Sequence, residues 1–241
     1  MTNDGEPSPL EDFWTVSSLG QHNAAAFGAA VRNFEPFDLP VHPMTPPGSF
    51  TALPRTRDDR TQRLLSSRRS GRQFSTRSME TKTLSRVLAA VGHGSNGALV
   101  PAAGGVESIF HYVFAQRAEG EFDRAVLAYS PHHHGLAVIA EAPPMDEVRR
   151  LFSLECSGDP QIIVVSVLHL DELRRKYGDR ALRFALQQVG HGQQNLGLRA
   201  AEDSLTAYIL GGALDREVLD VLGLGHTSAL VGGAMAIGYG K

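Results

Sequence analysis

Cysteine is almost absent from this chain, which has only Cys156 among its 241 residues. A single cysteine excludes an internal disulfide and any zinc site built from cysteines, and it fits a reducing, cytoplasmic setting. No stretch approaches about 18 uninterrupted apolar residues, so neither a spanning helix nor a membrane partner is expected. The opening residues, MTNDGEPSPLEDFW, are acidic and polar and lack the apolar core of a secretory signal.

Neither sign of charge dominates the composition, since the net charge is -3 and the isoelectric point is near 6.4. The composition therefore gives no reason to expect nucleic acid as a partner. The charge is nevertheless unevenly distributed, because ten Lys and Arg residues and three acidic residues lie between Arg55 and Arg86. An anionic ligand is expected near this segment.

Several nucleotide and nucleophile motifs are also missing. The chain contains no G-x-G-x-x-G, Walker or G-x-S-x-G sequence, so a nicotinamide cofactor on a Rossmann domain is not expected. Three adjacent histidines, His132–His134, cannot all face one ion from a turn, and no metal site is expected there. His93 and His226 lie in glycine turns and are assigned no role, and Cys156 is expected to be structural.

The residues that are present divide the chain into two parts. Residues 1–57 contain most of the 13 prolines and predict an extended arm along the surface, with one short helix near Asn23–Val31. Residues 58–241 alternate between helical and strand patterns. They predict one mixed α+β domain.

Hydrophobic periodicity predicts the main elements of that domain. A helix is predicted from the N-cap Thr81 to Val91, since the apolar residues between them share one face. Short β-branched or aromatic runs predict strands at Ile109–Ala115, Ala125–Tyr129, Leu136–Ala140, Ile162–Leu168 and Ala229–Tyr239. Further helices are predicted before Arg68 and at Met145–Leu154, Asp179–Ser204 and Asp215–Leu222, the last with Asp215 as its N-cap.

The segment Arg68-Arg69-Ser70-Gly71-Arg72 is the first candidate for chemistry. It places three guanidinium groups and a hydroxyl within five residues. Such a set suits a phosphate dianion, because arginine offers two parallel donors and serine a short one. The alternative, a solvated basic helix end, stays open.

Two turns and one residue pair are further candidates. Pro101–Gly105 and Gly211–Gly212 lack bulky side chains, so their backbones can approach a flat ligand closely, although ordinary turns have the same composition. Lys176 and Tyr177, on a predicted loop, offer a proton donor and acceptor whose pKa values burial or mutual contact would shift. An isolated pair of this kind is also common on surfaces.

A polar stripe follows the predicted long helix. Arg183, Gln187, His191 and Gln194 share one face, and Asn195 lies at its edge. Such a stripe is usually solvated. Because its surroundings are apolar, burial in a subunit or ligand interface is the alternative.

Taken in order, these segments resemble the SagB-type dehydrogenases, flavin enzymes of azol(in)e-containing peptide biosynthesis within the nitroreductase superfamily. Arg68–Phe74 (RRSGRQF) resembles the superfamily's RRS-x-R-x-F opening, and Pro101–Val113 (PAAGGVESIFHYV) is similar to the branch's P-S-A-G-G turn and strand. The most specific match is Lys176–Leu198 (KYGDRALRFALQQVGHGQQNLGL), which resembles K-Y-G-D-R-A-Y-R-Y…GH…QN-L. The final GYG resembles the superfamily's last glycine-rich strand.

The resemblance implies a nitroreductase-like α+β fold, in which helices flank a mixed antiparallel sheet, and a homodimer with FMN at the subunit interface. It implies contacts to the phosphate and ribityl chain from Arg68, Arg69, Ser70 and Arg72, and contacts near N5 from Gly211 and Gly212. The turn formed by Pro101, Ala102, Ala103 and Gly104 would contact the flavin from the partner subunit. Gln194, Asn195 and Lys241 complete the implied cofactor set, and Lys176 and Tyr177 are the implied catalytic residues.

The implied reaction is FMN-dependent oxidation of thiazoline or oxazoline rings in a ribosomal peptide, with a YcaO-type cyclodehydratase as a partner. Three alternatives stay open: cyclodipeptide or peptide Cα–Cβ dehydrogenation, NAD(P)H-dependent nitro reduction, and a non-catalytic scaffold in a peptide-modifying complex. The chain departs from the branch at two places. Ala102 replaces a serine, and Glu107-Ser108 replaces an aromatic-proline pair, which leads us to expect weaker flavin binding or a different redox potential.

Overall fold

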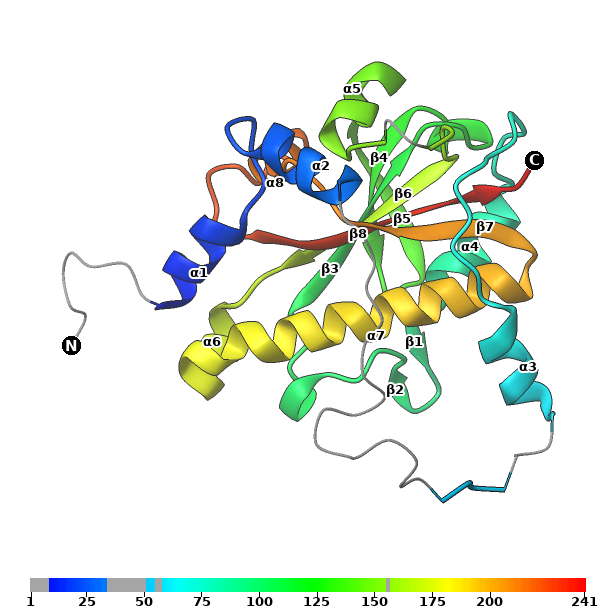
Figure 1. Cartoon of the computed structure of the whole chain (residues 1–241), viewed down its shortest axis with the longest axis horizontal. Coiled ribbons are helices and arrows are strands. Elements are labelled where there is room, and N and C mark those ends of the chain that lie inside the picture. Colours follow the sequence, from blue (N-terminus) through cyan, green and yellow to red (C-terminus); the bar gives the residue numbers. More distant parts are fainter. Residues whose placement is uncertain (1–8, 34–50, 55–57, 155–156) are drawn as a thin grey trace.

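A six-stranded sheet forms the centre of the protein in a computed structural model, which describes residues 9–33, 51–54, 58–154 and 157–241 (Figure 1). The strand order is β5-β4-β3-β6-β8-β7, and every neighbouring pair is antiparallel. The strands are β3 (Ile109–Ala115), β4 (Ala125–Ser130), β5 (Gly135–Glu141), β6 (Ile162–Leu168), β7 (Leu205–Leu210) and β8 (Leu230–Tyr239). The predicted α+β class with an antiparallel sheet is confirmed, and Cys156 lies outside the described residues.

Helices cover both faces of this sheet (Figure 1). One face carries α4 (Thr81–Ala89) and α7 (Ala181–Glu202), whereas the other carries α5 (Met145–Leu151) and α8 (Asp215–Val221). The remaining elements are α1 (Pro9–Ser17), α2 (Ala24–Arg32), α3 (Arg60–Ser67), α6 (Asp171–Tyr177), the hairpin β1 (His93–Gly94) and β2 (Gly97–Ala98), and the 3-10 turns η1 (Ala103–Gly105), η2 (Gly120–Phe122) and η3 (Gly178–Arg180). Among the described residues, no helix combines the length and apolarity needed to cross a membrane.

The position of β6 in the core explains why its sequence is almost entirely apolar. All seven residues of β6 are buried, because β3 and β8 pair with its two edges and helices cover its two faces. Helix α7 approaches β8 closely at Gly232, where an added Cβ would lie 2.8 Å from Val189 Cγ2. Glycine at this position therefore sets how closely the long helix packs on the sheet.

Three sequence predictions about element ends are wrong. Thr81 is the first residue of α4, and Glu80 occupies the N-cap without a side-chain hydrogen bond. Asp215 is likewise the first residue of α8, after Leu214, because its carboxylate instead accepts a hydrogen bond of 3.1 Å from Leu19 N. Lys176 lies in the last turn of α6 and not on a loop.

Strand β7 was not predicted, although it forms one edge of the sheet. It follows α7 after a short turn at Ser204, which adopts a left-handed conformation with φ of 55°. Helix ends of this type usually carry glycine or asparagine. Because serine is not typical of this position, the sequence does not show where the helix ends and the strand begins.

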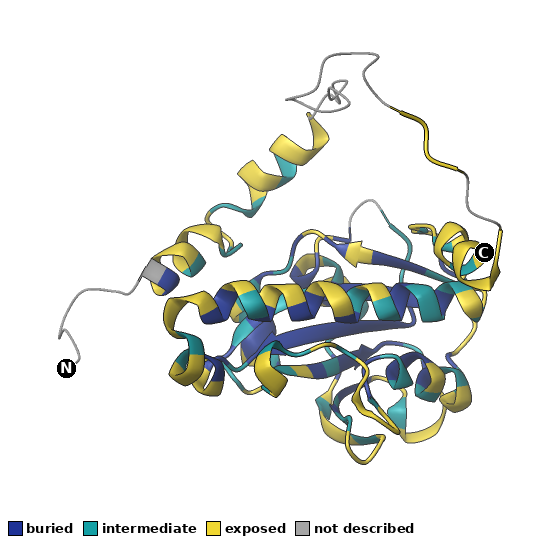
Figure 2. Ribbon diagram, turned by 90° about the horizontal axis from the view of Figure 1, so that it is seen from below, coloured by how far each residue is buried: buried dark blue, intermediate teal, exposed yellow. Residues whose placement is uncertain are grey.

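The N-terminal arm contains two helices where one was predicted. Helix α2 confirms the helix expected near Asn23–Val31, and α1 is additional. Leu10 of α1 is buried in a cluster with Leu173 and Leu182, although most other residues of the two helices are exposed (Figure 2). The arm is thus held at a few points, while residues 34–50 lie outside the described part.

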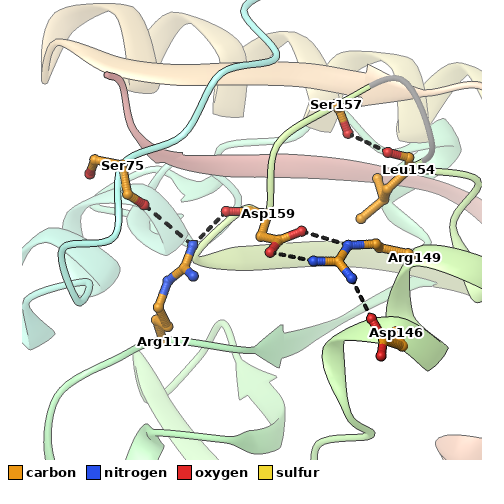
Figure 3. A network of polar contacts seen from close by, with 7 residues as sticks. All are labelled: Ser75, Arg117, Asp146, Arg149, Leu154, Ser157 and Asp159. Atoms are coloured by element: carbon orange, nitrogen blue, oxygen red, sulfur yellow. Dashed lines mark hydrogen bonds and ion pairs between the residues drawn. The ribbon is translucent and has the colours of Figure 1, made fainter.

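A polar network joins Ser75, which follows the basic segment Arg68–Arg72, to the chain around Asp159 and to α5 (Figure 3). Arg149 of α5 donates to both carboxylate oxygens of Asp159, at 2.8 and 2.7 Å. Arg117 bridges the carbonyl oxygens of Asp159 and Ser75, at 2.6 and 3.3 Å. Because Ser75 closely follows the basic segment, this network fixes the end of that segment in space.

Candidate functional site

The basic segment Arg68–Arg72 runs along the free edge of β7. Gly71 N donates a hydrogen bond of 3.1 Å to Ala207 O, and an added Cβ at Gly71 would lie 2.8 Å from Thr206 Cγ2. Glycine is therefore needed for this approach. Further along, Phe74 forms an isolated bridge with Gly240, which brings the C-terminal Lys241 beside the basic segment.

The guanidinium groups of this segment have no acidic partner among the residues that the structure describes. Within these residues, none of Arg68, Arg69 and Arg72 forms an ion pair. Arg69 Nη1 instead donates to Ser66 O at 2.6 Å, and Ser70 is exposed. Positive charges that no described carboxylate neutralises suit an anion site.

The three arginines do not all lie on one side of β7. The stem of Arg68 lies near Gly197 of α7, whereas the Arg72 guanidinium lies 5.2 Å above the centre of the Tyr208 ring. Tyr208 belongs to the core on the α5–α8 face. A cavity of about 260 Å³ on the α7 side is lined by residues that include Arg69, Gly71 and Gly197. Arg68 and Arg69 are thus closer to this cavity than Arg72 is.

Gly211 and Gly212 follow β7 at its other end. Gly211 is four residues beyond Ala207, a span of about 13 Å along a strand. An added Cβ at Gly211 would meet no atom within 4 Å, so Gly211 faces open space, whereas Gly212 is buried and its added Cβ would lie 3.1 Å from Ser153 Oγ. A cavity of about 250 Å³ lies here, with walls from the glycine turn, from β8 and from the arm residues Trp14 and Phe27.

Lys176 and Tyr177 contact the Pro101–Gly105 turn of the same chain. Lys176 Nζ donates a hydrogen bond of 3.0 Å to Gly104 O. An added Cβ at Gly104 would lie 2.2 Å from Tyr177 Oη and 2.5 Å from Lys176 Nζ, and the φ of Gly104 is +58°. The structure therefore brings together two predicted sites that lie about 70 residues apart in the chain.

The residues along α7 divide between surface and structural positions. Arg183, Gln187, His191 and Gln194 are exposed in the single chain. Asn195 is half-buried, and its Nδ2 donates to Ala90 O at 3.2 Å and to Leu99 O at 3.1 Å. Asn195 thus ties α7 to the end of α4, whereas the exposed residues of the stripe are accessible to a ligand or a subunit.

Sequence reasoning missed two buried polar residues at the centre of the molecule. Gln188 accepts a hydrogen bond of 3.2 Å from Ser108 Oγ and donates one of 3.4 Å to Val106 O, so it fixes the segment after the Pro101–Gly105 turn. His111 contacts Ser166 Oγ at 3.2 Å, and burial lowers its pKa to about 4. The available signal for Gln188 was its place on the buried face of α7, beside Val189.

The residues present fit a flavin mononucleotide. Its phosphate dianion matches the unpaired guanidinium groups near Arg68, and its flat ring matches the open backbone at Gly211. Strand β7 separates the two positions by about 13 Å, a span that suits an extended ribityl chain. Ala102 offers no hydroxyl, so the Pro101–Gly105 turn would contact a ring through backbone and methyl groups alone.

The chain is similar to several known proteins. "Putative nitroreductase MJ1384" of Methanocaldococcus jannaschii is 26% identical over 175 residues, which cover 70% of this chain and 87% of that protein. The Escherichia coli microcin synthetase McbBCD complex with truncated pro-MccB17 bound contains a chain with a TM-score of 0.76 and 19% identity, over 96% of this chain and 92% of that one. A "putative nitroreductase in complex with FMN" from Desulfovibrio desulfuricans has a TM-score of 0.52 and 15% identity, over 77% and 88% of the two chains. Residues 65–239 match the nitroreductase family, and the chain therefore belongs to it.

Proposed function

We propose that this protein is an FMN-dependent oxidoreductase that dehydrogenates thiazoline or oxazoline rings in a peptide. The observation that carries the proposal is the contact of Lys176 and Tyr177 with Gly104, because it joins a proton-transfer pair to the turn expected against the flavin. The similarity to a chain of the microcin synthetase complex over nearly the whole length supports this substrate class. So does the resemblance of Lys176–Leu198 to the SagB-type enzymes.

The proposed cofactor would be held along β7. Arg68 and Arg69 would bind the phosphate, with Ser70, Arg72 and Lys241 nearby, and the backbone of Gly211 and Gly212 would meet the ring edge. When bound, FMN would supply the acceptor for a hydride, and oxygen or another acceptor would then reoxidise it.

The proposed homodimer is supported by the separation of the proton-transfer pair from the cavity at the expected ring edge. The cavity at Gly211–Gly212 is lined by the glycine turn, by β8 and by the arm. Among the described residues that line it, none belongs to the Pro101–Gly105 turn or to the Lys176–Tyr177 pair. A second subunit would bring the Pro101–Gly104 turn and its attached pair to the other chain's flavin.

The chain's own residues would handle the proton. Oxidation removes two electrons and two hydrogens from the azoline ring, one hydrogen as a hydride and the other as a proton. Lys176 Nζ or Tyr177 Oη would take that proton from a ring carbon. The Phe184 ring, with its centre 4.9 Å from that of Tyr177, would hold the phenol in place.

Purified enzyme and a synthetic thiazoline peptide in air provide the test. We expect bound FMN and a loss of two hydrogens per ring by mass spectrometry. Lys176→Ala and Tyr177→Phe should each lower the rate by about 10²- to 10⁴-fold, with FMN retained. Lys82→Ala, at an exposed site on α4, is the matched control. Full activity in both pair variants, with FMN bound, would contradict the assigned role.

The same material separates the alternatives. Rapid flavin bleaching by NAD(P)H without peptide would favour nitro reduction, to which the name of the Methanocaldococcus jannaschii relative points. Turnover of a cyclic dipeptide, but not of the azoline peptide, would favour Cα–Cβ dehydrogenation. Protein that neither retains FMN nor gains activity on its addition would favour a scaffold subunit, such as one that associates with a YcaO-type cyclodehydratase.

A further inference from the structure

A cluster of potential metal ligands lies beside the Pro101–Gly105 turn. It consists of His93 from β1, Glu107 from the segment after η1, and His132 from the turn between β4 and β5. Each residue offers one ligand atom, and the three atoms lie within 4.8 Å of one another. We propose that His93, Glu107 and His132 bind a divalent transition-metal ion with the coordination chemistry of zinc.

The distances suit this ion after small side-chain movements. Zinc binds imidazole nitrogen and carboxylate oxygen at about 2.0 to 2.2 Å, so tetrahedral ligand atoms lie about 3.3 Å apart. His93 Nε2 and Glu107 Oε2 are already 3.0 Å apart. The His132 ring lies close by, with its centre 4.1 Å from that of His93. His132 is exposed, so its side chain is free to close the remaining gap.

Space for a fourth ligand is present. A small cavity of about 30 Å³ is lined by His93 and Glu107 together with Ala102 and His111. A cavity of this size holds one water molecule. Three protein ligands and one water form the open arrangement that zinc adopts where it keeps an exchangeable position.

The histidines adjacent to His132 have other partners. His133 Nδ1 contacts Ser130 Oγ at 2.9 Å, while His134 contacts Tyr129 Oη at 2.9 Å and Ser85 Oγ at 2.8 Å. The three neighbours in sequence therefore do not converge on one point. The proposed ligands come from three separate segments, which no spacing rule reveals.

Metal binding would join these three segments. The hairpin that follows α4, the β4–β5 turn and the chain leaving the Pro101–Gly105 turn would share one ion. Because Ala102 lines the same cavity, the ion would also restrict the movement of that turn. Binding should therefore raise the thermal stability of the folded chain.

Zinc titration of the tag-free, full-length protein, treated with EDTA and dialysed, tests the proposal. A chromophoric chelator would report competition for ZnCl₂, and CoCl₂ would report ligand identity through its visible absorption. We expect one equivalent per chain. His132→Asn and Glu107→Gln should each weaken affinity at least about tenfold, since even residues outside the coordination shell change metal affinity 10- to 100-fold.

His133→Asn is the matched control, because it removes the adjacent exposed histidine of the same turn. It should leave zinc affinity and the cobalt spectrum unchanged. The proposal is overturned if no saturable equivalent binds, or if His133→Asn weakens binding as much as His132→Asn does. Since His132 is exposed, its variant keeps the test valid even if Glu107→Gln fails to fold.

Discussion

The two ends of helix α7 use positive charge in different ways. Near its C-terminal end, Arg68 and Arg69 have no acidic partner among the described residues. Before its N-terminal end, the Lys176 ammonium group is held by Gly104 O. Charges without partners are available to a ligand, whereas the lysine is already positioned by the protein. We propose that the first end, the binding end, binds the cofactor and that the second, the proton-transfer end, moves the proton.

The N-terminal arm belongs to the second of these ends. Trp14 packs against the cluster that contains Leu182, and Leu19 pairs with Asp215 through two hydrogen bonds of 3.1 Å. Trp14 and Leu19 also line the cavity at Gly211–Gly212. The described part of the arm thus closes one side of the space where the proposed ring edge lies.

Gly104→Ala should displace Lys176 and Tyr177 at the proton-transfer end and cause the largest loss of activity. Its Cβ would overlap Tyr177 Oη and Lys176 Nζ, so both side chains must move. We expect at least about 100-fold lower dehydrogenation activity, because loss of a positioned acid or base costs this much. Gly105→Ala is a close control, since its φ is also positive, at +75°, and its Cβ would meet nothing within 4 Å. Equal losses in both variants would mean that backbone strain, and not the contact, is responsible.

Arg68→Ala should weaken FMN binding and leave the residues of the proton-transfer end in place. Loss of one charged donor to a phosphate costs about 1.5 to 3 kcal/mol, so FMN affinity should fall about 10- to 100-fold. Fluorescence titration of FMN measures this directly. Arg63→Ala removes an exposed arginine that already pairs with Asp58 and should change affinity little. An unchanged affinity in Arg68→Ala would show that the phosphate binds elsewhere.

Asp215→Asn tests the attachment of the arm and should have the smallest effect. Burial raises the pKa of Asp215 to about 6, against the opposing hydrogen bonds from Leu19 and Ser18. The folded state therefore holds this proton more tightly than the unfolded state, whose pKa is near 3.9. The contribution of Asp215 to stability is fully present below pH 4 and is lost as pH rises through 6.

Urea unfolding between pH 4 and pH 7 measures this contribution. Between pH 4 and pH 7, the free energy of unfolding of wild type should fall by about 1 to 2 kcal/mol relative to that of the asparagine variant, because the variant has no charge to bury. Asp220→Asn, at an exposed position of the same helix, controls for the general charge of α8. Glu217 is kept because its charge also raises the pKa of Asp215. A difference between variant and wild type that does not change with pH would exclude Asp215 as the titrating group.

Local patterns were enough for most of the elements. The periodicity of Leu84, Val87 and Leu88 identified α4, and the apolar run Ile162–Leu168 identified the central strand β6. These succeeded because the burial of each residue follows from its neighbours in sequence. Strand β7 was missed because it follows a left-handed serine, and no glycine or asparagine marks the boundary between helix and strand.

In the candidate site, too, the sequence identifies some features and only the fold reveals others. The sequence by itself determined which residue types could bind a phosphate or move a proton, since a cluster such as Arg68–Arg72 carries its chemistry in its composition. Only the tertiary structure decided which of them meet. Lys176 reaches Gly104, and His93 reaches Glu107 and His132, because sheet pairing and helix packing bring distant segments together at distances that spacing along the chain does not encode.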